Sequence, residues 1–154
     1  MHKDERAHAR RSTTTSDRGT SAREAPDFVL LGRMSMLPTL DAPRAARAAI
    51  AQWMPASIPR TLLQDAKLLV SELVTNSVRH GGAGGAPIVV SAGTSDRSAW
   101  FDVADAGDRS SVSRRPPTGT GGMGLNIVHE VASQWGTSDG DGTHVWFELA
   151  LRTA

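Results

Sequence analysis

Apolar residues recur at helical spacing in three segments of the chain. The first segment begins after Asp41, a residue type that caps helix N-termini, and ends at Pro55. Between these two residues, Ala46, Ile50 and Trp53 fall on one face of a helix. The pattern predicts an amphipathic helix with one face turned toward a core.

The second segment is the longest, from about Arg60 to His80, and two glycines follow it as a C-cap. Its apolar positions form a stripe with a row of valines beside it: Leu62, Ala66, Leu69, Leu73, Val70, Val74 and Val78. The third predicted helix, over 124–135, also keeps its apolar residues on one face: Leu125, Val128, Val131 and Trp135.

Strand-forming residues predict five strands before, between and after these helices. The segments are 28–33, 87–93, 98–104, 136–138 and 143–151. The second and third are separated by a short polar turn, so they should pair as a hairpin. In the last strand, the aliphatic and phenylalanine residues alternate with a second set of residues, which is typical of a half-buried strand. The two sets are Val145, Phe147, Leu149 and Leu151, and His144, Trp146, Glu148 and Ala150.

The elements follow one another as β-α-α-β-β-loop-α-β-β, where the loop is the glycine- and proline-rich segment 105–122. This order favours the α+β class. We expect a two-layer α/β sandwich in which a mixed, mostly antiparallel sheet carries the helices on one face. The length of 154 residues fits one domain.

Composition separates an N-terminal tail from this domain. Residues 1–25 contain no large apolar residue after Met1, so they cannot bury enough surface to offset the entropy of ordering. We therefore expect a disordered tail over 1–25 and one domain over 26–154. The tail carries much of the basic charge, with six of the 17 basic residues and four of the 16 acidic residues in 1–24.

Charge and composition exclude several classes of protein. Residues 25–154 hold 11 basic and 12 acidic residues, so the domain lacks the basic face that nucleic-acid binding requires. No apolar run approaches the about 20 residues that a membrane-spanning helix needs. The chain has no cysteine, which excludes disulfides and thiolate metal sites. No secretory signal is present, so we expect a cytoplasmic protein.

Three polar residues share one side of the long predicted helix. Glu72, Asn76 and His80 are spaced by four residues, so they lie one above another. An asparagine oxygen suits Mg²⁺, and a carboxylate one turn away can hold water or take a proton. The alternative interpretation is an ordinary polar helix face.

An acidic residue and a glycine stand where the third predicted strand ends. Asp105 follows an apolar strand, and Gly107 comes two residues later. Such a pair is common at turns. The functional interpretation is a carboxylate that accepts a hydrogen bond from an adenine amino group, beside a glycine that leaves room for the ring.

A glycine-rich segment stands directly before the third predicted helix: Gly119, Gly121, Gly122 and Gly124. Backbone N–H groups at a helix N-terminus can cradle phosphates, although the segment could also be only a flexible loop. The glycines formally match a dinucleotide fingerprint. That site is rejected because the segment follows two arginines and two prolines rather than a strand.

Taken in order, these parts resemble the GHKL ATPase superfamily of gyrase, histidine kinases and MutL. Residues 72–80, Glu-Leu-Val-Thr-Asn-Ser-Val-Arg-His, look like its N box, and 105–107 look like its G1 box. Residues 119–125 look like the G2 box, and 142–143, Gly-Thr, look like a residual G3 box. The resemblance covers roughly residues 28–151.

Within that superfamily the chain is most similar to small bacterial anti-sigma factors that are also serine-protein kinases. The phrase at 69–76, Leu-Val-Ser-Glu-Leu-Val-Thr-Asn, followed by Arg-His-Gly at 79–81, reads like that group. The resemblance implies partner switching. Such a protein binds a sigma factor, or instead binds and phosphorylates a STAS-domain anti-anti-sigma antagonist. It also implies that a homodimer is possible.

The resemblance further implies a role for each matching residue. Asn76 would hold Mg²⁺ against the triphosphate of ATP, and Asp105 would accept from the adenine N6 amino group. Glu72 would deprotonate or orient the attacking hydroxyl of the partner's serine. The remaining nucleotide-binding positions would be Gly107, Gly119, Gly121, Gly122, Gly124, Leu125 and Thr143.

One departure from the pattern keeps other functions open. Many relatives continue the G1 box as Asp-x-Gly-x-Gly, whereas Asp108 and Arg109 follow Gly107 here. A carboxylate near the phosphates weakens nucleotide binding unless it points to solvent. The alternatives are a nucleotide-binding regulator that sequesters a partner without relevant kinase activity, and a sequestering module whose nucleotide site is vestigial.

Overall fold

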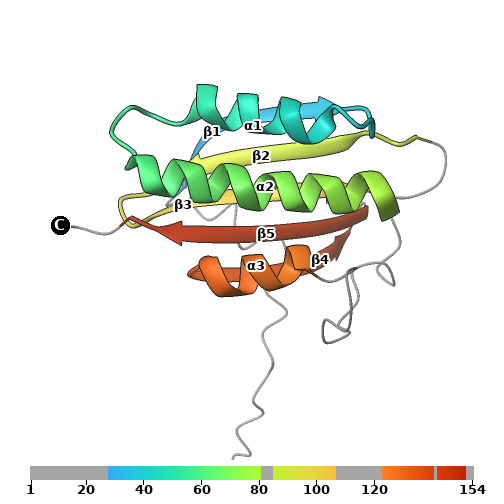
Figure 1. Ribbon diagram of the computed structural model, residues 1–154. Helices are drawn as coiled ribbons and strands as arrows, with labels where there is room; N and C mark the ends of the chain where they lie inside the picture. The colour runs from blue at the N-terminus through green and yellow to red at the C-terminus, as the bar shows by residue number, and fades with distance from the viewer. Residues whose placement is uncertain (1–27, 81–84, 107–122, 141, 152–154) are drawn as a thin grey trace, which may run out of the picture.

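The computed structural model describes residues 28–80, 85–106, 123–140 and 142–151 (Figure 1). The elements follow in the order β1 (Val29–Met36), α1 (Ala42–Trp53), α2 (Arg60–His80), β2 (Ile88–Thr94), β3 (Ser98–Asp105), α3 (Met123–Val131), β4 (Gln134–Gly140) and β5 (Gly142–Ala150). This is the predicted order. The predicted tail over 1–25 and all but two residues of the predicted loop over 105–122 lie outside the described residues.

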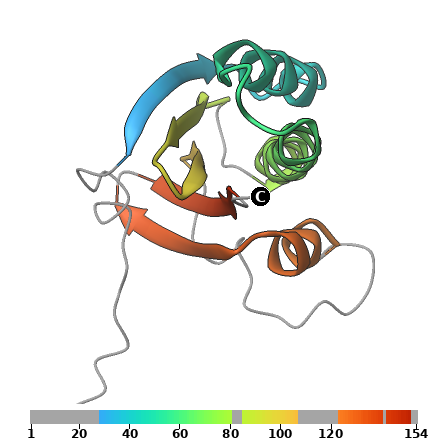
Figure 2. The same cartoon turned by 90° about the vertical axis from the view of Figure 1, so that its left-hand side faces the viewer.

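The described strands form one sheet in the order β1-β2-β3-β5-β4, and every neighbouring pair is antiparallel. Figure 2 shows the three helices together on one side of this sheet. The two-layer α+β prediction is confirmed, with antiparallel pairing throughout the described sheet.

The core lies between the helices and the sheet. It is built from the apolar stripe of each helix and from alternate residues of the central strands. Phe101 on β3 and Phe147 on β5 are directly opposite each other and stack with ring centroids 4.9 Å apart. Ile50 of α1 and Leu69 of α2 are fully buried in the same core. Burial of this apolar surface provides the main stabilisation of the fold.

The third helix is shorter than the sequence predicts. It ends at Val131, and Trp135 lies on strand β4, opposite Phe147 of β5. The backbone N–H and the hydroxyl of Ser133 both donate to the carbonyl oxygen of Glu148, which turns the chain into the sheet. The predicted helix end at 135 is wrong because Trp135 continues the helical spacing but reaches the core from a strand.

Two strands are longer than predicted. Strand β1 continues to Met36, three residues beyond the predicted end, and pairs with β2 over its length with an irregularity between Leu30 and Gly32. Strand β4 runs from Gln134 to Gly140, two residues beyond the predicted segment at each end. Ladder hydrogen bonds to a neighbouring strand extend a strand beyond the residues whose own composition favours it.

The face of the sheet opposite the helices, which we call the outer face, is largely buried over β3 and β5, whereas Arg33 and Ser35 of β1 on the same face are exposed. Trp146 and Glu148 are 3% and 7% exposed, although the alternating pattern of β5 predicted a solvent-facing row. Figure 2 shows the edge strands β1 and β4 bending toward this side, so the sheet curves around its outer face. None of the helices in the described ranges combines the length and the apolar character needed to cross a membrane.

Candidate functional site

Helix α2 carries the first group of predicted site residues. Glu72 and Asn76 are half-buried on consecutive turns, and His80 is exposed in the last turn. Leu73 and Val74, which alternate with them around the helix, are almost fully buried in the core. This packing fixes the rotation of the helix, so Glu72 and Asn76 are held at the edge of the core rather than in it.

Asp105, the predicted adenine acceptor, is the last residue of β3 and is half-buried. The hydroxyl of Ser77 on α2 donates a hydrogen bond of 2.6 Å to its Oδ2. Ser77 follows Asn76 directly and is 7% exposed. The contact therefore ties the end of β3 to the helix turn that carries Asn76.

Strand β5 begins beside Asp105. Thr143 is the antiparallel partner of Asp105 in the ladder and is buried. Gly142 before it has a φ of 107°, a backbone conformation that favours glycine, and a Cβ there would collide with the carbonyl oxygen of Asp105. Glycine at 142 is thus required by a close approach of two backbones next to the predicted adenine acceptor.

Helix α3 reaches the same end of the molecule. Figure 1 shows that the C-terminal end of α2, the start of β5 and the start of α3 lie together at one end of the sheet. Gly124 is the second residue of α3, and Leu125 after it is half-buried against the core. A helix N-terminus here presents backbone N–H donors and a partial positive charge, which suit an anion.

The other predicted phosphate-binding and ring-contacting residues lie outside the described residues. They are Gly107, Gly119, Gly121 and Gly122, together with Asp108, where the sequence differs from the common G1 pattern. Their roles remain predictions from the sequence.

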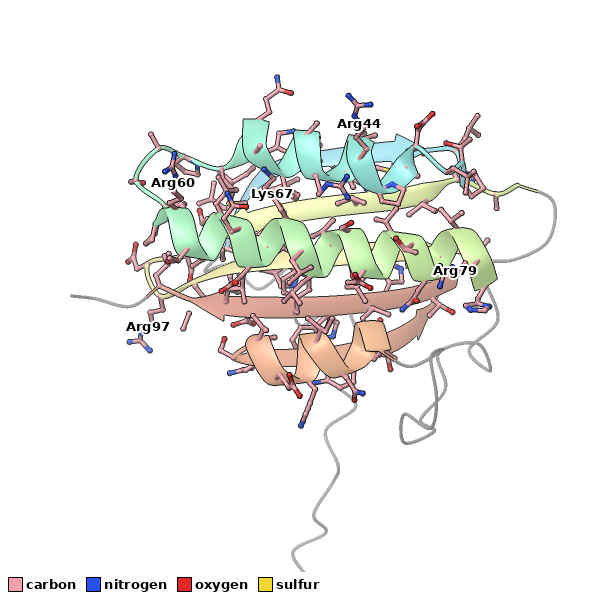
Figure 3. The ribbon with its side chains drawn as sticks, viewed as in Figure 1. Arg44, Arg60, Lys67, Arg79 and Arg97 are labelled. Atoms are coloured by element: carbon pink, nitrogen blue, oxygen red, sulfur yellow. The ribbon has the colours of Figure 1, made fainter. Side chains whose placement is uncertain are left out.

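Two cations stand at the end of α2. Arg79 and His80 occupy its last turn, and both are exposed. Figure 3 shows Arg79 at this end of the helix, far along α2 from Lys67 and Arg60. A helix C-terminus carries partial negative charge, which repels phosphate groups. These two cations reduce that repulsion.

Ser77 is a site residue that the sequence reasoning missed. Its position between Asn76 and Val78 on a mostly apolar helix face was the available signal, because a serine there must find a partner when it is buried. Which partner it finds depends on the packing of α2 against β3.

The arrangement has the chemistry that a nucleotide and a magnesium ion require. Asp105 offers a carboxylate, oriented by Ser77, for a group that donates hydrogen bonds. Asn76 offers an amide oxygen, the donor type that Mg²⁺ accepts from a protein, and a charged phosphate can supply the further oxygens. The residues present therefore fit both groups.

Comparisons with known proteins agree with this geometry. The family model described as histidine kinase-like ATPase domain matches residues 36–149. A comparison with curated proteins gave no match.

Among solved structures, the chain is similar to the crystal structure of the RsbU and RsbW domains of Rv1364c from Mycobacterium tuberculosis. The TM-score is 0.61 at 23% sequence identity. The match covers 80% of this chain and 34% of that one, so this chain spans about a third of that protein's length. The likeness supports the fold assignment, and the family match adds the ATPase type. The chain belongs to the histidine kinase-like ATPase domain family, which implies that it binds ATP.

Proposed function

We propose that the protein is an ATP-binding anti-sigma factor with serine/threonine-protein kinase activity toward a STAS-domain antagonist. Nucleotide binding is supported by the contacts around Asp105, which bonds to Ser77, pairs with Thr143 and lies against the backbone of Gly142. These contacts supply an oriented carboxylate at the edge of the core, beside a backbone contact that only glycine permits. The partner class rests on the resemblance of the 69–81 stretch to small anti-sigma kinases.

Asp105 would accept a hydrogen bond from the adenine amino group. A carboxylate acceptor makes a stronger hydrogen bond than a neutral one, and the bond from Ser77 fixes its orientation before the nucleotide arrives. Asn76 would hold Mg²⁺, which neutralises phosphate charge when bound. The glycine-rich segment before α3 would surround the phosphates, and Leu125 in the first turn of α3 would pack beneath it.

Glu72 would act on the incoming hydroxyl of the substrate protein. The hydroxyl oxygen forms a bond to the terminal phosphorus while the bond from phosphorus to the bridging oxygen breaks and ADP leaves. The hydroxyl proton passes to the carboxylate of Glu72. Phosphoryl transfer needs mainly positioning and charge neutralisation, so this short set of side chains suffices.

Phosphorylation would then switch partners. A phosphate adds about −1.5 to −2 charges to the antagonist at neutral pH and three acceptor oxygens. The loss of the antagonist would free the protein to bind the sigma factor.

The second candidate is a nucleotide-binding regulator that holds a partner without relevant kinase activity. The departure from the G1 pattern favours it, because Asp108 follows Gly107 and a carboxylate near the phosphates would oppose their charge.

Two experiments in sequence separate the candidates. Calorimetric titration with ATP and Mg²⁺ tests the nucleotide site, and the absence of binding would leave only a sequestering module. Transfer of radiolabelled phosphate from ATP to a STAS protein co-purified from the native cell tests the kinase. ATP binding without transfer, in the presence of a bound STAS partner, would favour the regulator.

A further inference from the structure

The charged residues of the described chain are unevenly distributed over its elements. Helices α1 and α2 carry five of the seven basic residues in the described ranges and only two of the nine acidic residues. The basic residues are Arg44, Arg47, Arg60, Lys67 and Arg79, and the acidic residues are Asp65 and Glu72. The near-neutral charge of the whole chain therefore conceals a positive side over these two helices.

Three of these cations, Arg47, Arg60 and Lys67, line the contact between α1 and α2, which we call the helix seam. Arg60, Lys67 and Ser71 share one side of α2, since seven and then four residues separate them. Nη1 of Arg47 on α1 donates a hydrogen bond of 2.6 Å to the Ser71 hydroxyl, so this side of α2 is the one that faces α1. Figure 3 shows Arg60 at the start of α2 and Lys67 between the two helices.

The cations of the helix seam have no acidic partner within the described part of the chain. On a helix, a carboxylate pairs with a cation three or four residues away, and none of the three has an acidic residue at that spacing. Arg60 is exposed and Lys67 is half-buried, and neither forms an ion pair with another described residue. Arg47 uses one N–H on Ser71, whereas a guanidinium has five N–H donors. The helix seam thus presents charge that this part of the chain does not neutralise.

Apolar surface accompanies this charge. Leu68, next to Lys67, is 44% exposed, whereas Leu69 after it is fully buried. On α1, Ala48 and Ala51 are exposed within one turn of Arg47. Small side chains let the backbone of a further helix approach closely, and Leu68 offers it an apolar contact. The surface along the helix seam therefore combines spaced cations with a low apolar strip.

Charge complementarity indicates what fits this surface. Arg60 and Ser71, which holds the Arg47 guanidinium, are eleven residues apart, a distance of about 16 Å along α2. A helix of about three turns that lies along the helix seam can present carboxylates at the same spacing. Apolar residues beside those carboxylates would then meet Leu68, as in other complexes in which an amphipathic helix binds a groove.

Other occupants match these features less well. A second copy of this chain in a two-fold dimer would place the same cations opposite one another. A nucleic-acid strand carries a phosphate about every 3.4 Å, whereas Arg60 and Lys67 lie about 10 Å apart along α2. An anionic membrane is bound through large apolar or aromatic side chains beside the cations. Among the described residues beside the helix seam, the exposed apolar side chains are one leucine and small alanines.

We propose that the helix seam binds an acidic amphipathic helix of a partner protein. This inference rests on the proposed function for the existence of a protein partner, and it names the chemistry of that partner. Ser71 directly precedes Glu72, so a partner held along the helix seam lies beside the residue proposed to act on its hydroxyl. Binding at the helix seam itself requires neither ATP nor phosphate transfer.

Two synthetic peptides of about 15 residues and identical composition are the probes. In one peptide glutamate recurs every three or four residues with leucine beside it, and in the other the same residues are scrambled. Fluorescence anisotropy of each labelled peptide with the full-length protein measures the affinity. We expect the patterned peptide to bind about tenfold more tightly than the scrambled one, and more weakly as the salt concentration rises.

R60E and K67E should each weaken binding of the patterned peptide by about fivefold, because each removes an attraction and adds a repulsion. L68Q should also weaken it without any change of charge. R97E makes the same charge change in the exposed turn between β2 and β3, so it should leave the affinity within about twofold.

Equal binding of the two peptides, or equal losses of affinity in K67E and R97E, would overturn the proposal. So would tighter binding of duplex DNA or of phosphatidylserine vesicles than of the patterned peptide. Calorimetric titration of the same samples with ATP and Mg²⁺ measures the nucleotide site separately. A failure of the proposed function at that site is therefore distinguishable from a failure at the helix seam.

Discussion

The Ser77 hydroxyl donates a hydrogen bond of 2.6 Å to Asp105 Oδ2, and this bond joins the C-terminal part of helix α2 to the end of strand β3. Ser77 and Asp105 are 28 residues apart in sequence, and between them lie the end of α2 and the whole β2–β3 hairpin. The bond orients the carboxylate that we propose as the acceptor for the nucleotide. Its removal should therefore change ligand binding more than folding.

Ser77→Ala should weaken ATP binding by about tenfold, because a hydrogen bond to a charged group contributes about 1.5 kcal/mol or more and tenfold corresponds to about 1.4 kcal/mol. Isothermal titration calorimetry measures the change. Ser71→Ala is the matched control, since Ser71 lies on the same helix and accepts a hydrogen bond from Arg47 instead. Equal losses of ATP affinity in both variants would remove the special role of Ser77.

Asp105→Asn should weaken ATP binding by about 10- to 100-fold and alter the melting temperature much less. The amide loses the charge-assisted bond to the adenine amino group, worth about 1.5–3 kcal/mol. Asp96→Asn, in the exposed turn between β2 and β3, serves as the control for a general change of charge. Unchanged ATP affinity in Asp105→Asn would place Asp105 outside the nucleotide site.

Gly142→Ala should lower the free energy of unfolding by more than the about 1–3 kcal/mol expected for an unfavourable backbone conformation alone. The added Cβ collides with the carbonyl oxygen of Asp105. Gly85→Ala separates the two effects, because Gly85 also has a positive φ, 68°, but no atom lies within 4 Å of its added Cβ. Urea denaturation measures both variants. Equal destabilisation would show that the backbones at 105 and 142 separate easily.

The sequence predicted the elements of the fold well where one residue pattern decided them. The 21-residue helix α2 has the predicted ends, because a long apolar stripe and a glycine pair define it. The end of α3 was mispredicted because Trp135 fits the helical spacing while packing from a strand. Hydrophobic periodicity indicates which residues are buried in the core. Whether such a residue lies on a helix or on a strand is decided by tertiary packing.

The candidate site was predictable to the same extent. Asp105 and Thr143 were named from separate motifs, and the ladder makes them direct neighbours. Ser77 was not named, because its partner lies on another element. The burial of Trp146 and Glu148 on the outer face also escaped prediction, since strict alternation cannot report how strongly a sheet curves.

Stability should fall as the pH rises above 6.5, because of the pair between His144 and Asp102. The hydrogen bond to Asp102 raises the pKa of His144 above 6.5, partial burial opposes this, and the nearby charges of Arg33 and Asp105 lower and raise it respectively. The protonated imidazole is therefore favoured in the folded state. Its contribution is complete below pH 6.5 and is lost as the pH rises through the folded-state pKa.

His144→Gln should flatten this dependence, since glutamine keeps a donor for Asp102 but does not titrate. Thermal unfolding between pH 5.5 and about 8.5 measures the slope for both proteins. His80→Gln, at the exposed end of α2, is the control. A slope that persists in His144→Gln would assign the effect to other groups.

Glu72→Ala separates the kinase from the regulator without catalysis. Glu72 lies one helical turn before Asn76 and is half-buried, so it is on the same side of α2 as the residue that would hold the metal. If it takes or orients the hydroxyl proton, its loss should slow phosphate transfer to a STAS partner by about 10²- to 10⁴-fold. ATP affinity should remain within a few fold, because a carboxylate repels phosphates and offers them no direct bond. Glu130→Ala, at an exposed position on α3, should transfer phosphate at the wild-type rate. Transfer of phosphate by Glu72→Ala at the wild-type rate would exclude Glu72 as the base. A melting temperature equal to that of the wild type would show that the variant is folded.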